Sequence, residues 1–194
     1  MTLWRGFSRS DDSPYLVGQR IFLRLPQNQD YAEWVDLRRS SHDFLQPWEP
    51  SWPKDDLTRH GFRRRLKRYS RDIKDRTAYT FFLFQQNSSQ IIGGISLGNI
   101  RYGITRSGSL GYWMGEPFAR QGYMTEAVRM VCEFAFDNLN LHRVEAACLP
   151  TNEFSKKLLL SLDFSWEGQA RQYLKINGLW RDHLLFALLA SDVD

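Results

Sequence analysis

Between residues 20 and 76, the spacing of apolar positions predicts one strand followed by helices. Arg20–Leu25 reads as a strand, and Asn28–Leu45 follows it as a helix. Leu45–Pro53 holds three prolines, each of which removes a backbone donor and restricts the preceding residue, so this stretch is not expected to be helical. Arg59–Arg76 is predicted to be a helix, because one of its faces collects Phe62, Leu66, Tyr69 and Ile73.

From Tyr79 onward the period shortens to that of strands. Tyr79–Phe84, Gln90–Ile100 and Gly108–Gly115 read as a three-stranded meander. A helix over Thr125–Leu139, a strand at His142–Leu149 and a helix over Thr151–Phe164, capped by Thr151 or Asn152, come next. Two last strands flank Asn177-Gly178, a strong hairpin signal.

This order, β-α-α-β-β-β-α-β-α-β-β, predicts a mixed α/β (α+β) fold and not an alternating parallel dinucleotide-binding sheet. The 194 residues suit a single domain, which we expect to span residues 1–194 with its core at about 20–189.

Composition narrows the class of protein. Hydrophobic residues make up 42% and charged residues 25%, as in globular chains. The formal net charge of +4 is compatible with a phosphate-bearing ligand or an RNA-rich partner. Cys132 and Cys148 are expected to be buried free thiols, and no metal-ligand spacing exists. No apolar signal core or membrane-length run occurs, so we expect a cytoplasmic protein without a membrane partner.

The junction "GYWMGEPFARQGYMTEA", Gly111–Ala127, passes from a strand to a helix. If the helix begins at Thr125, the amides of residues 120–125 are unpaired first-turn donors, and the helix dipole adds to their attraction for an anion. Gly122 would let a ligand approach the backbone, and Arg120 and Gln121 add donors. A diphosphate fits such a site, although Gly and Pro in this stretch also serve simply to turn the chain. Neither a Walker loop nor a GxGxxG fingerprint is present.

Several stretches together resemble the GCN5-related N-acetyltransferase (GNAT) superfamily, and within it the RimJ/RimL type of ribosomal-protein alanine N-acetyltransferases, closest to the RimJ type. They are "FLQPWEP", "GYW", "GYMTEA", "HRVEA" and "NGLWRDHLLFAL", and the resemblance runs from about Arg20 to Leu189. It implies a mixed, mostly antiparallel sheet of six to seven strands flanked by helices, and acetyl-CoA as co-substrate.

The resemblance also assigns positions toward acetyl-CoA. The strand end that receives the pantetheine and thioester corresponds to Trp113, Met114 and Gly115. The pyrophosphate loop corresponds to Ala119–Met124, followed by the start of the helix; its expected contacts are Arg120, Gln121, Gly122, Tyr123, Met124 and Thr125. The Asn at the start of the next helix corresponds to Asn152.

The chain departs from the family pattern at three of these positions. Ala119 stands where Gln or Arg is usual, and Met124 where Gly or Ala is usual. Leu159 occupies the position of the usual Tyr acid, and Ser155 is the replacement that the RimJ/RimL pattern suggests, at hydrogen-bonding range of the leaving sulfur. Tyr123 is a further candidate for that role.

Candidates for the acceptor side are carboxylates. Glu49, in the proline-stiffened "PWEP" loop beside Trp48 and Trp52, is the first candidate, either as a general base or as a group that binds the incoming ammonium; a surface acid is the alternative. Glu116 beside the thioester strand is the second candidate, and it also suits a helix N-terminus.

Four other titratable residues have mainly structural interpretations. Asp182 is a catalytic candidate or a structural acid. His183 is read as a core or edge histidine, His142 as a strand-start residue, and Glu145 as a member of an ion pair.

The function predicted from these residues is acetyl transfer to a primary amine, most simply the N-terminal α-amine of a protein such as a ribosomal protein. A small amine, such as a polyamine or an antibiotic, is the alternative acceptor, and a non-enzymatic acyl-CoA- or RNA-binding module is the alternative class. The basic helix at 59–76 suits an rRNA-bearing or acidic partner, as in ribosome association, or is simply solvated. No DNA partner is expected, and the oligomeric state stays open.

Overall fold

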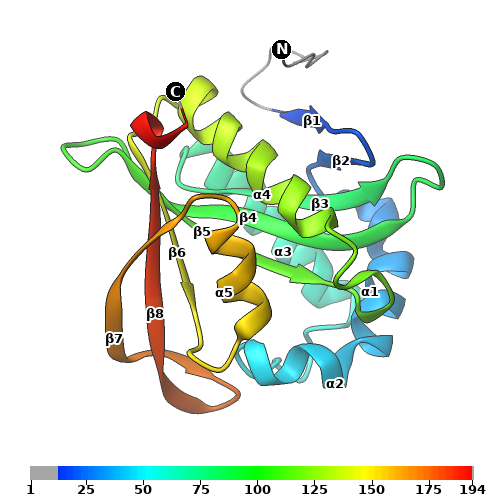
Figure 1. The fold of residues 1–194 in the computed structure, drawn as a ribbon. Helices are drawn as coiled ribbons and strands as arrows, with labels where there is room; N and C mark the ends of the chain where they lie inside the picture. Colours follow the sequence, from blue (N-terminus) through cyan, green and yellow to red (C-terminus); the bar gives the residue numbers. More distant parts are fainter. Residues whose placement is uncertain (1–12, 194) are drawn as a thin grey trace.

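The computed structural model describes residues 13–193 and contains one eight-stranded sheet (Figure 1). Its strands, in chain order, are β1 (Tyr15–Val17), β2 (Ile21–Arg24), β3 (Tyr79–Gln85), β4 (Ile91–Arg101), β5 (Ser107–Met114), β6 (Arg143–Cys148), β7 (Ser165–Ile176) and β8 (Leu179–Leu189). The mixed α/β class is confirmed, but the expected count of six to seven strands is wrong. The missed strand is β1, whose three residues are too few to show a period of two.

Five α-helices flank the sheet in the described part of the chain: α1 (Tyr31–Ser40), α2 (His42–Leu45), α3 (Arg59–Lys74), α4 (Tyr123–Glu133) and α5 (Glu153–Leu160). Short 3-10 turns lie at Asn28–Asp30, Gln46–Trp48, Glu116–Phe118 and Ala190–Asp192, and a π turn at Phe134–Asn138 continues α4. No helix among residues 13–193 combines the length and the apolar character that a membrane crossing requires.

Strand order in the sheet is β1-β2-β3-β4-β5-β6-β8-β7, and every neighbouring pair is antiparallel except β5 and β6. The parallel pair arises because α4 carries the chain across the face of the sheet between the two strands. Its register runs only from Ser107 opposite Arg143 to Leu110 opposite Ala146.

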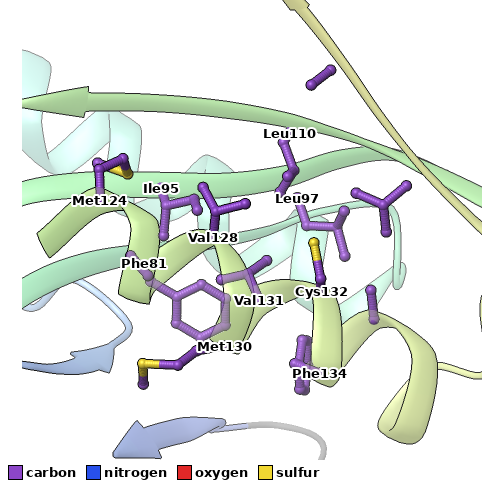
Figure 2. Packing of buried hydrophobic residues seen from close by; sticks show 14 of the residues in the cluster. Phe81, Ile95, Leu97, Leu110, Met124, Val128, Met130, Val131, Cys132 and Phe134 are labelled. Atoms are coloured by element: carbon purple, nitrogen blue, oxygen red, sulfur yellow. The ribbon is translucent and has the colours of Figure 1, made fainter. Parts of the chain in front are cut away.

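The two faces of the sheet carry separate apolar clusters. In Figure 1, α4 and α5 lie in front of the sheet and α3 lies behind it. Figure 2 shows Val128 and Val131 of α4 over Phe81, Ile95 and Leu97 of the central strands, all nearly inaccessible. Behind the sheet, the second cluster packs α1 and α3 on β3 through Trp34, Val35, Leu37, Phe62, Phe82 and Phe84.

Two predicted helices begin or break elsewhere than expected. The expected helix over Asn28–Leu45 is interrupted at Ser41, a fully buried residue whose hydroxyl accepts a hydrogen bond from the Glu116 amide at 2.9 Å. The helix expected from Thr125 begins at Tyr123, because Gly122 adopts a left-handed conformation with φ +81° and serves as its N-cap.

The C-terminal hairpin is as expected. Asn177 and Gly178 form its turn with φ of 44° and 79°, the left-handed values that a two-residue turn matching strand twist requires. At the start of α5, Asn152 rather than Thr151 is the cap, since its Oδ1 accepts a hydrogen bond from the Ser155 amide at 3.1 Å.

Candidate active site

A gap in the sheet organises the site. Beyond Leu110 and Ala146 the parallel strands part, and β5 continues through Met114 with hydrogen-bonded pairing only to β4. The other strand, β6, continues to Cys148 paired only to β8. The last residues of β5 therefore present an unpaired backbone edge inside the sheet, which an extended ligand can pair with.

One end of this gap faces the loop before α4. None of the backbone amides of residues 120–125 donates a hydrogen bond to another atom among residues 13–193, so they form a cluster of free donors at the positive end of the helix dipole. The sequence predicted this feature, but it attributed Gly122 to close ligand approach. Its φ of +81° shows that the turn itself requires glycine.

Arg20 holds this loop in place. Its guanidinium donates to the Gln121 carbonyl at 2.9 Å and to Glu126 at 3.2 Å, and it lies 4.8 Å from the centre of the Tyr123 ring. The Gln121 side chain donates to the Pro117 carbonyl at 2.8 Å, so it also supports the loop. Arg120, by contrast, is exposed and stacks on Phe154 of α5 at 5.4 Å, which keeps its donors beside the free amides.

Two of the expected cofactor contacts point into the core. The Tyr123 hydroxyl accepts a hydrogen bond from Gln85 at 2.9 Å, so the prediction that it serves the leaving sulfur with Ser155 is not supported. The Met124 side chain packs among the core residues in Figure 2 and is 8% exposed. Tyr123 and Met124 therefore offer only their backbone amides to the expected cofactor site. Thr125, on the same turn, is half-buried.

The other end of the gap contains a pair of hydroxyls. Ser155, on the first turn of α5, lies 2.8 Å from the hydroxyl of Tyr112 on β5, measured between the two oxygens. Cys148, the last residue of β6, adjoins the same serine. The sequence assigned Ser155 to this region but did not identify Tyr112, and Leu159, at the usual acid position, is fully buried in the core.

Burial decides the protonation of this cluster. It raises the pKa of Tyr112 to about 12, against the opposing effect of the hydrogen bond with Ser155. Burial also raises the pKa of Cys148 above its ordinary value. Tyr112 and Cys148 are therefore neutral at physiological pH, and the Tyr112 hydroxyl keeps its proton for donation.

Glu49 is tied into a rigid network behind β5. Arg38 donates to both of its carboxylate oxygens, at 2.7 and 2.6 Å, and the Trp52 indole donates at 2.8 Å. The Arg38 guanidinium lies between the rings of Trp52 and Trp113, at 4.2 and 4.8 Å. The predicted proximity to Trp52 is confirmed, but the ion pair with a 6% exposed arginine was not foreseen.

The loop that carries Glu49 also touches the C-terminal hairpin. The Asn177 amide donates to the Glu49 carbonyl at 2.9 Å, and the Gln46 side chain donates to the Asn177 side chain at 3.3 Å. These contacts connect the two halves of the sheet on the far side of the gap.

Two cavities meet at this network. The larger, about 1260 Å³, is lined by both sides of the gap and includes Glu49, Tyr112, Cys148, Asn152 and Ser155. The smaller, about 370 Å³, lies behind β5 between Arg38, Trp52 and Trp113. Glu49 and Tyr112 line both cavities, and Ser155 lines the larger one. The structure therefore brings Glu49, the first candidate on the acceptor side, and Ser155, the candidate for stabilising the leaving thiolate, to one connected space.

The remaining predicted positions at the end of β5 differ in role. Trp113 faces the smaller cavity, whereas Met114 packs against the core on the opposite face. Gly115 lies so close to Leu37 that a Cβ would approach its Cδ1 to 2.4 Å. Glu116 has an exposed side chain and does not line either cavity, so the structure does not place it with Glu49 and Ser155.

The other titratable candidates have structural partners. Asp182 accepts hydrogen bonds from the Gln172 amide and the Gln169 side chain, which hold its pKa below the usual range and fasten the irregular part of β7. Glu145 pairs with Arg143 at 2.9 Å, as expected.

The two histidines and the two cysteines are placed as follows. His183 is buried with its ring against Tyr173, and His142 is exposed just before β6. Cys132 and Cys148 are free and buried, as expected. No group of three or more metal-ligating side chains occurs within residues 13–193.

Three important residues escaped the sequence analysis. Arg20 and Arg38 reach their partners over 101 and 11 residues, and a single arginine in a strand or helix carries no signal for such a contact. The alternation of side chains along a strand could have identified Tyr112, because it places Tyr112 and Trp113 on opposite faces of β5.

Comparison with known proteins agrees with this geometry. The family model of the acetyltransferase (GNAT) domain matches residues 20–165. A probable N-acetyltransferase, YjcK of Bacillus subtilis, is 34% identical over 91% of this chain and 98% of its own length. The [ribosomal protein uS5]-alanine N-acetyltransferase of Escherichia coli is 33% identical over 91% of both chains.

Solved structures give the same result. The ribosomal-protein-S5-alanine acetyltransferase of Vibrio fischeri superposes with a TM-score of 0.85 at 32% identity, covering 93% of this chain and 98% of that one. Mycobacterium smegmatis RimJ, in complex with CoA-disulfide, has a TM-score of 0.85 at 28% identity, covering 89% and 83%. With its parted strands, its free-amide loop and a family match over residues 20–165, this chain belongs to the GNAT acetyltransferase family.

Proposed function

We propose that this enzyme transfers the acetyl group of acetyl-CoA to the N-terminal α-amine of a protein, with ribosomal proteins as the first candidates. The observation that carries the proposal is the gap between β5 and β6, which has free amides at one end and the Tyr112–Ser155 pair at the other. Relatives named for alanine acetylation of ribosomal protein uS5, and a neighbour solved with a CoA-disulfide, support the choice of both substrates.

The donor side has groups suited to each part of coenzyme A. The free amides of residues 120–125, with exposed Arg120 beside them, suit the diphosphate. The unpaired edge at Trp113–Gly115 suits the amide groups of the pantetheine arm, which can pair with it as a strand does. Asn152 uses its Oδ1 as the helix cap, which leaves its side-chain NH₂ for this arm.

The chemistry is attack of a neutral amine on the thioester carbonyl. A C–N bond forms, the C–S bond breaks, and the sulfur leaves as a thiolate while the nitrogen loses a proton to water. An α-amine has a pKa of about 7.7–8, so on the order of a tenth of it is already neutral at pH 7 and a strong base is not needed.

Charge develops on sulfur as the C–S bond breaks, and Ser155 is placed to donate a hydrogen bond to it. Tyr112 stands behind Ser155 at 2.8 Å and, by donating to the serine oxygen, polarises the serine hydroxyl toward the sulfur. In this assignment Ser155 is a catalytic residue and Tyr112 a positioning residue.

On the acceptor side, Glu49 serves as an anchor for the incoming amino group and not as a free base. Its Oε2 already accepts two hydrogen bonds, while its Oε1 accepts one and retains capacity for another. Its ion pair with buried Arg38 holds the side chain in one place at the meeting of the two cavities.

The proposal is tested by acetylation of short peptides, followed as CoA thiol release. A peptide with a free N-terminal alanine should be acetylated. The same peptide with a blocked N-terminus and one free lysine is the matched control and should not be. Faster turnover of spermidine or an aminoglycoside than of the peptide would contradict the choice of acceptor.

The role of Glu49 has its own test. Glu49→Gln should raise KM for the peptide and leave kcat within about threefold, because an anchor acts on the ground state and the transition state alike. A fall in kcat of roughly 100-fold that is partly restored by raising the pH would instead identify Glu49 as the general base.

A further inference from the structure

Helix α3 concentrates the positive charge of the chain. Its 16 residues include eight Arg or Lys and a single Asp. The whole chain has 26 basic and 22 acidic residues, so the remaining 178 residues hold 18 basic and 21 acidic ones and are net acidic. The net charge of +4 therefore comes from this one helix.

Half of the basic side chains on α3 are neutralised or stacked within the protein. Arg64 pairs with Asp55 at 2.8 Å, and Arg65 pairs with Asp56. Arg59 lies 4.6 Å from the ring centre of Tyr31, and Arg68 lies 5.2 Å from that of Tyr69.

The other four basic side chains form what we call the α3 stripe: Arg63, Lys67, Arg71 and Lys74. All four are exposed, and none has a side-chain hydrogen bond, ion pair or ring contact within residues 13–193. At about 100° per residue they fall within roughly 80° of arc, and at 1.5 Å per residue they span about 16 Å.

Such a stripe has an energetic cost. Like charges four residues apart on a helix destabilise it. No acidic side chain within residues 13–193 pairs with the stripe, so all four charges are available to an anionic partner.

The surroundings of the stripe indicate the kind of partner. None of the large apolar side chains that are exposed in the described residues lies on α3, and its apolar side packs against the sheet through Phe62 and Leu66. Protein interfaces have an apolar centre, and membrane-binding helices insert an apolar face. A surface that offers only charge suits the phosphate backbone of a nucleic acid, whose non-specific binding is electrostatic.

The location of the stripe relates it to the acceptor. Arg68 and Tyr69, on the same helix, line the larger cavity together with Glu49. A chain end that enters this cavity therefore passes close to α3.

We propose that the α3 stripe binds RNA through its phosphates and thereby docks an RNA-associated acceptor protein beside the active site. The choice of RNA over other polyanions rests on the proposed function: an acceptor that binds RNA is itself basic and would be repelled by α3, whereas its RNA would be attracted.

The test measures binding of a fluorescein-labelled RNA hairpin of mixed sequence by anisotropy, at several KCl concentrations. Arg63, Lys67, Arg71 and Lys74 are all replaced by Gln, which keeps helix propensity. We expect affinity at low salt to fall at least tenfold. The slope of log K against log salt should fall by about 3, which is roughly 0.7–0.9 for each of four lost phosphate contacts.

The matched control removes the same charge elsewhere, by changing Lys54, Arg129, Arg171 and Arg181 to Gln. This control should retain RNA affinity within about threefold. Equal loss in both variants would show that net charge and not the stripe binds RNA, and would overturn the proposal. Stronger binding of polyglutamate or of phosphatidylserine vesicles than of RNA would overturn it as well.

Acetylation of a free short peptide separates this proposal from the proposed function. The stripe variant should acetylate the peptide at the native rate and lose only RNA affinity. Absence of peptide acetylation by the native protein would contradict the proposed function, while the RNA measurement would still decide the role of the stripe.

Discussion

Removing one hydroxyl tests how the leaving sulfur is stabilised. Tyr112→Phe keeps the ring and deletes the hydroxyl that lies 2.8 Å from Ser155. A neutral hydrogen bond contributes about 0.5–1.5 kcal/mol, and a chain of bonds strengthens each member by roughly a tenth to a third. We therefore expect Ser155→Ala to lower kcat about tenfold and Tyr112→Phe about threefold.

The assay compares kcat with the Kd of acetyl-CoA, measured by calorimetry. Charge appears on sulfur only as the C–S bond breaks, so both substitutions should lower kcat and leave the Kd within about twofold. A purely structural role for Tyr112 would instead alter the Kd or the stability without a specific effect on kcat.

The double variant distinguishes action through Ser155 from independent action. If Tyr112 acts only by polarising the serine, Tyr112→Phe has no further effect once Ser155 is alanine. Tyr31→Phe is the matched control, because its hydroxyl also donates a hydrogen bond, to the Leu57 carbonyl at 3.0 Å, away from both cavities. It should retain native kcat.

Two results would refute this reasoning. One is a double variant whose kcat loss is the product of the two single losses, since the residues would then act separately. The other is an equal loss of kcat in Tyr31→Phe, since any lost tyrosine hydroxyl would then have the same effect.

Three further predictions concern other parts of the protein. Glu49→Gln should lower the free energy of unfolding by about 2–4 kcal/mol in urea, because buried Arg38 loses a charged bidentate partner; an unchanged midpoint would contradict this. Gly122→Ala should weaken acetyl-CoA binding about tenfold by calorimetry, because φ +81° disfavours a Cβ, whereas Gly103→Ala, with open space around it, should not. Burial raises the pKa of Cys132 from 9.0 to about 12, so its stabilising contribution is complete below pH 9 and is lost as the pH rises toward 12. By pH 10.5 the loss is roughly 2 kcal/mol, and Cys132→Ala should remove it from the pH dependence of the urea midpoint.

The sequence predicted the elements in which the apolar pattern extends over many residues or a turn has a strong local signal. The helix expected at Arg59–Arg76 is found at Arg59–Lys74, and Phe62 on its predicted face is 1% exposed. The turn at Asn177-Gly178 was identified from two residues alone. In these places local chemistry and tertiary packing favour the same conformation, so the local signal is sufficient.

Prediction failed where a distant contact determines the local structure. At the break at Ser41, the serine hydroxyl accepts a hydrogen bond from the Glu116 amide, 75 residues away, and the loop before α4 is held by Arg20, 101 residues from Gln121. The Tyr112–Ser155 pair joins residues 43 positions apart on a strand and a helix. The apolar periodicity of a sequence does not encode such long-range contacts, and the family resemblance identified only Ser155.

The gap between β5 and β6 has a mechanical consequence. The two halves of the sheet are joined at one end by the register from Ser107 to Leu110, and at the other by the contact between Asn177 and the Glu49 loop. The opening between the two strands is thus closed at both ends. Under the proposed function, both substrates enter this opening by an end: the acceptor protein by its N-terminus and acetyl-CoA by its pantetheine arm.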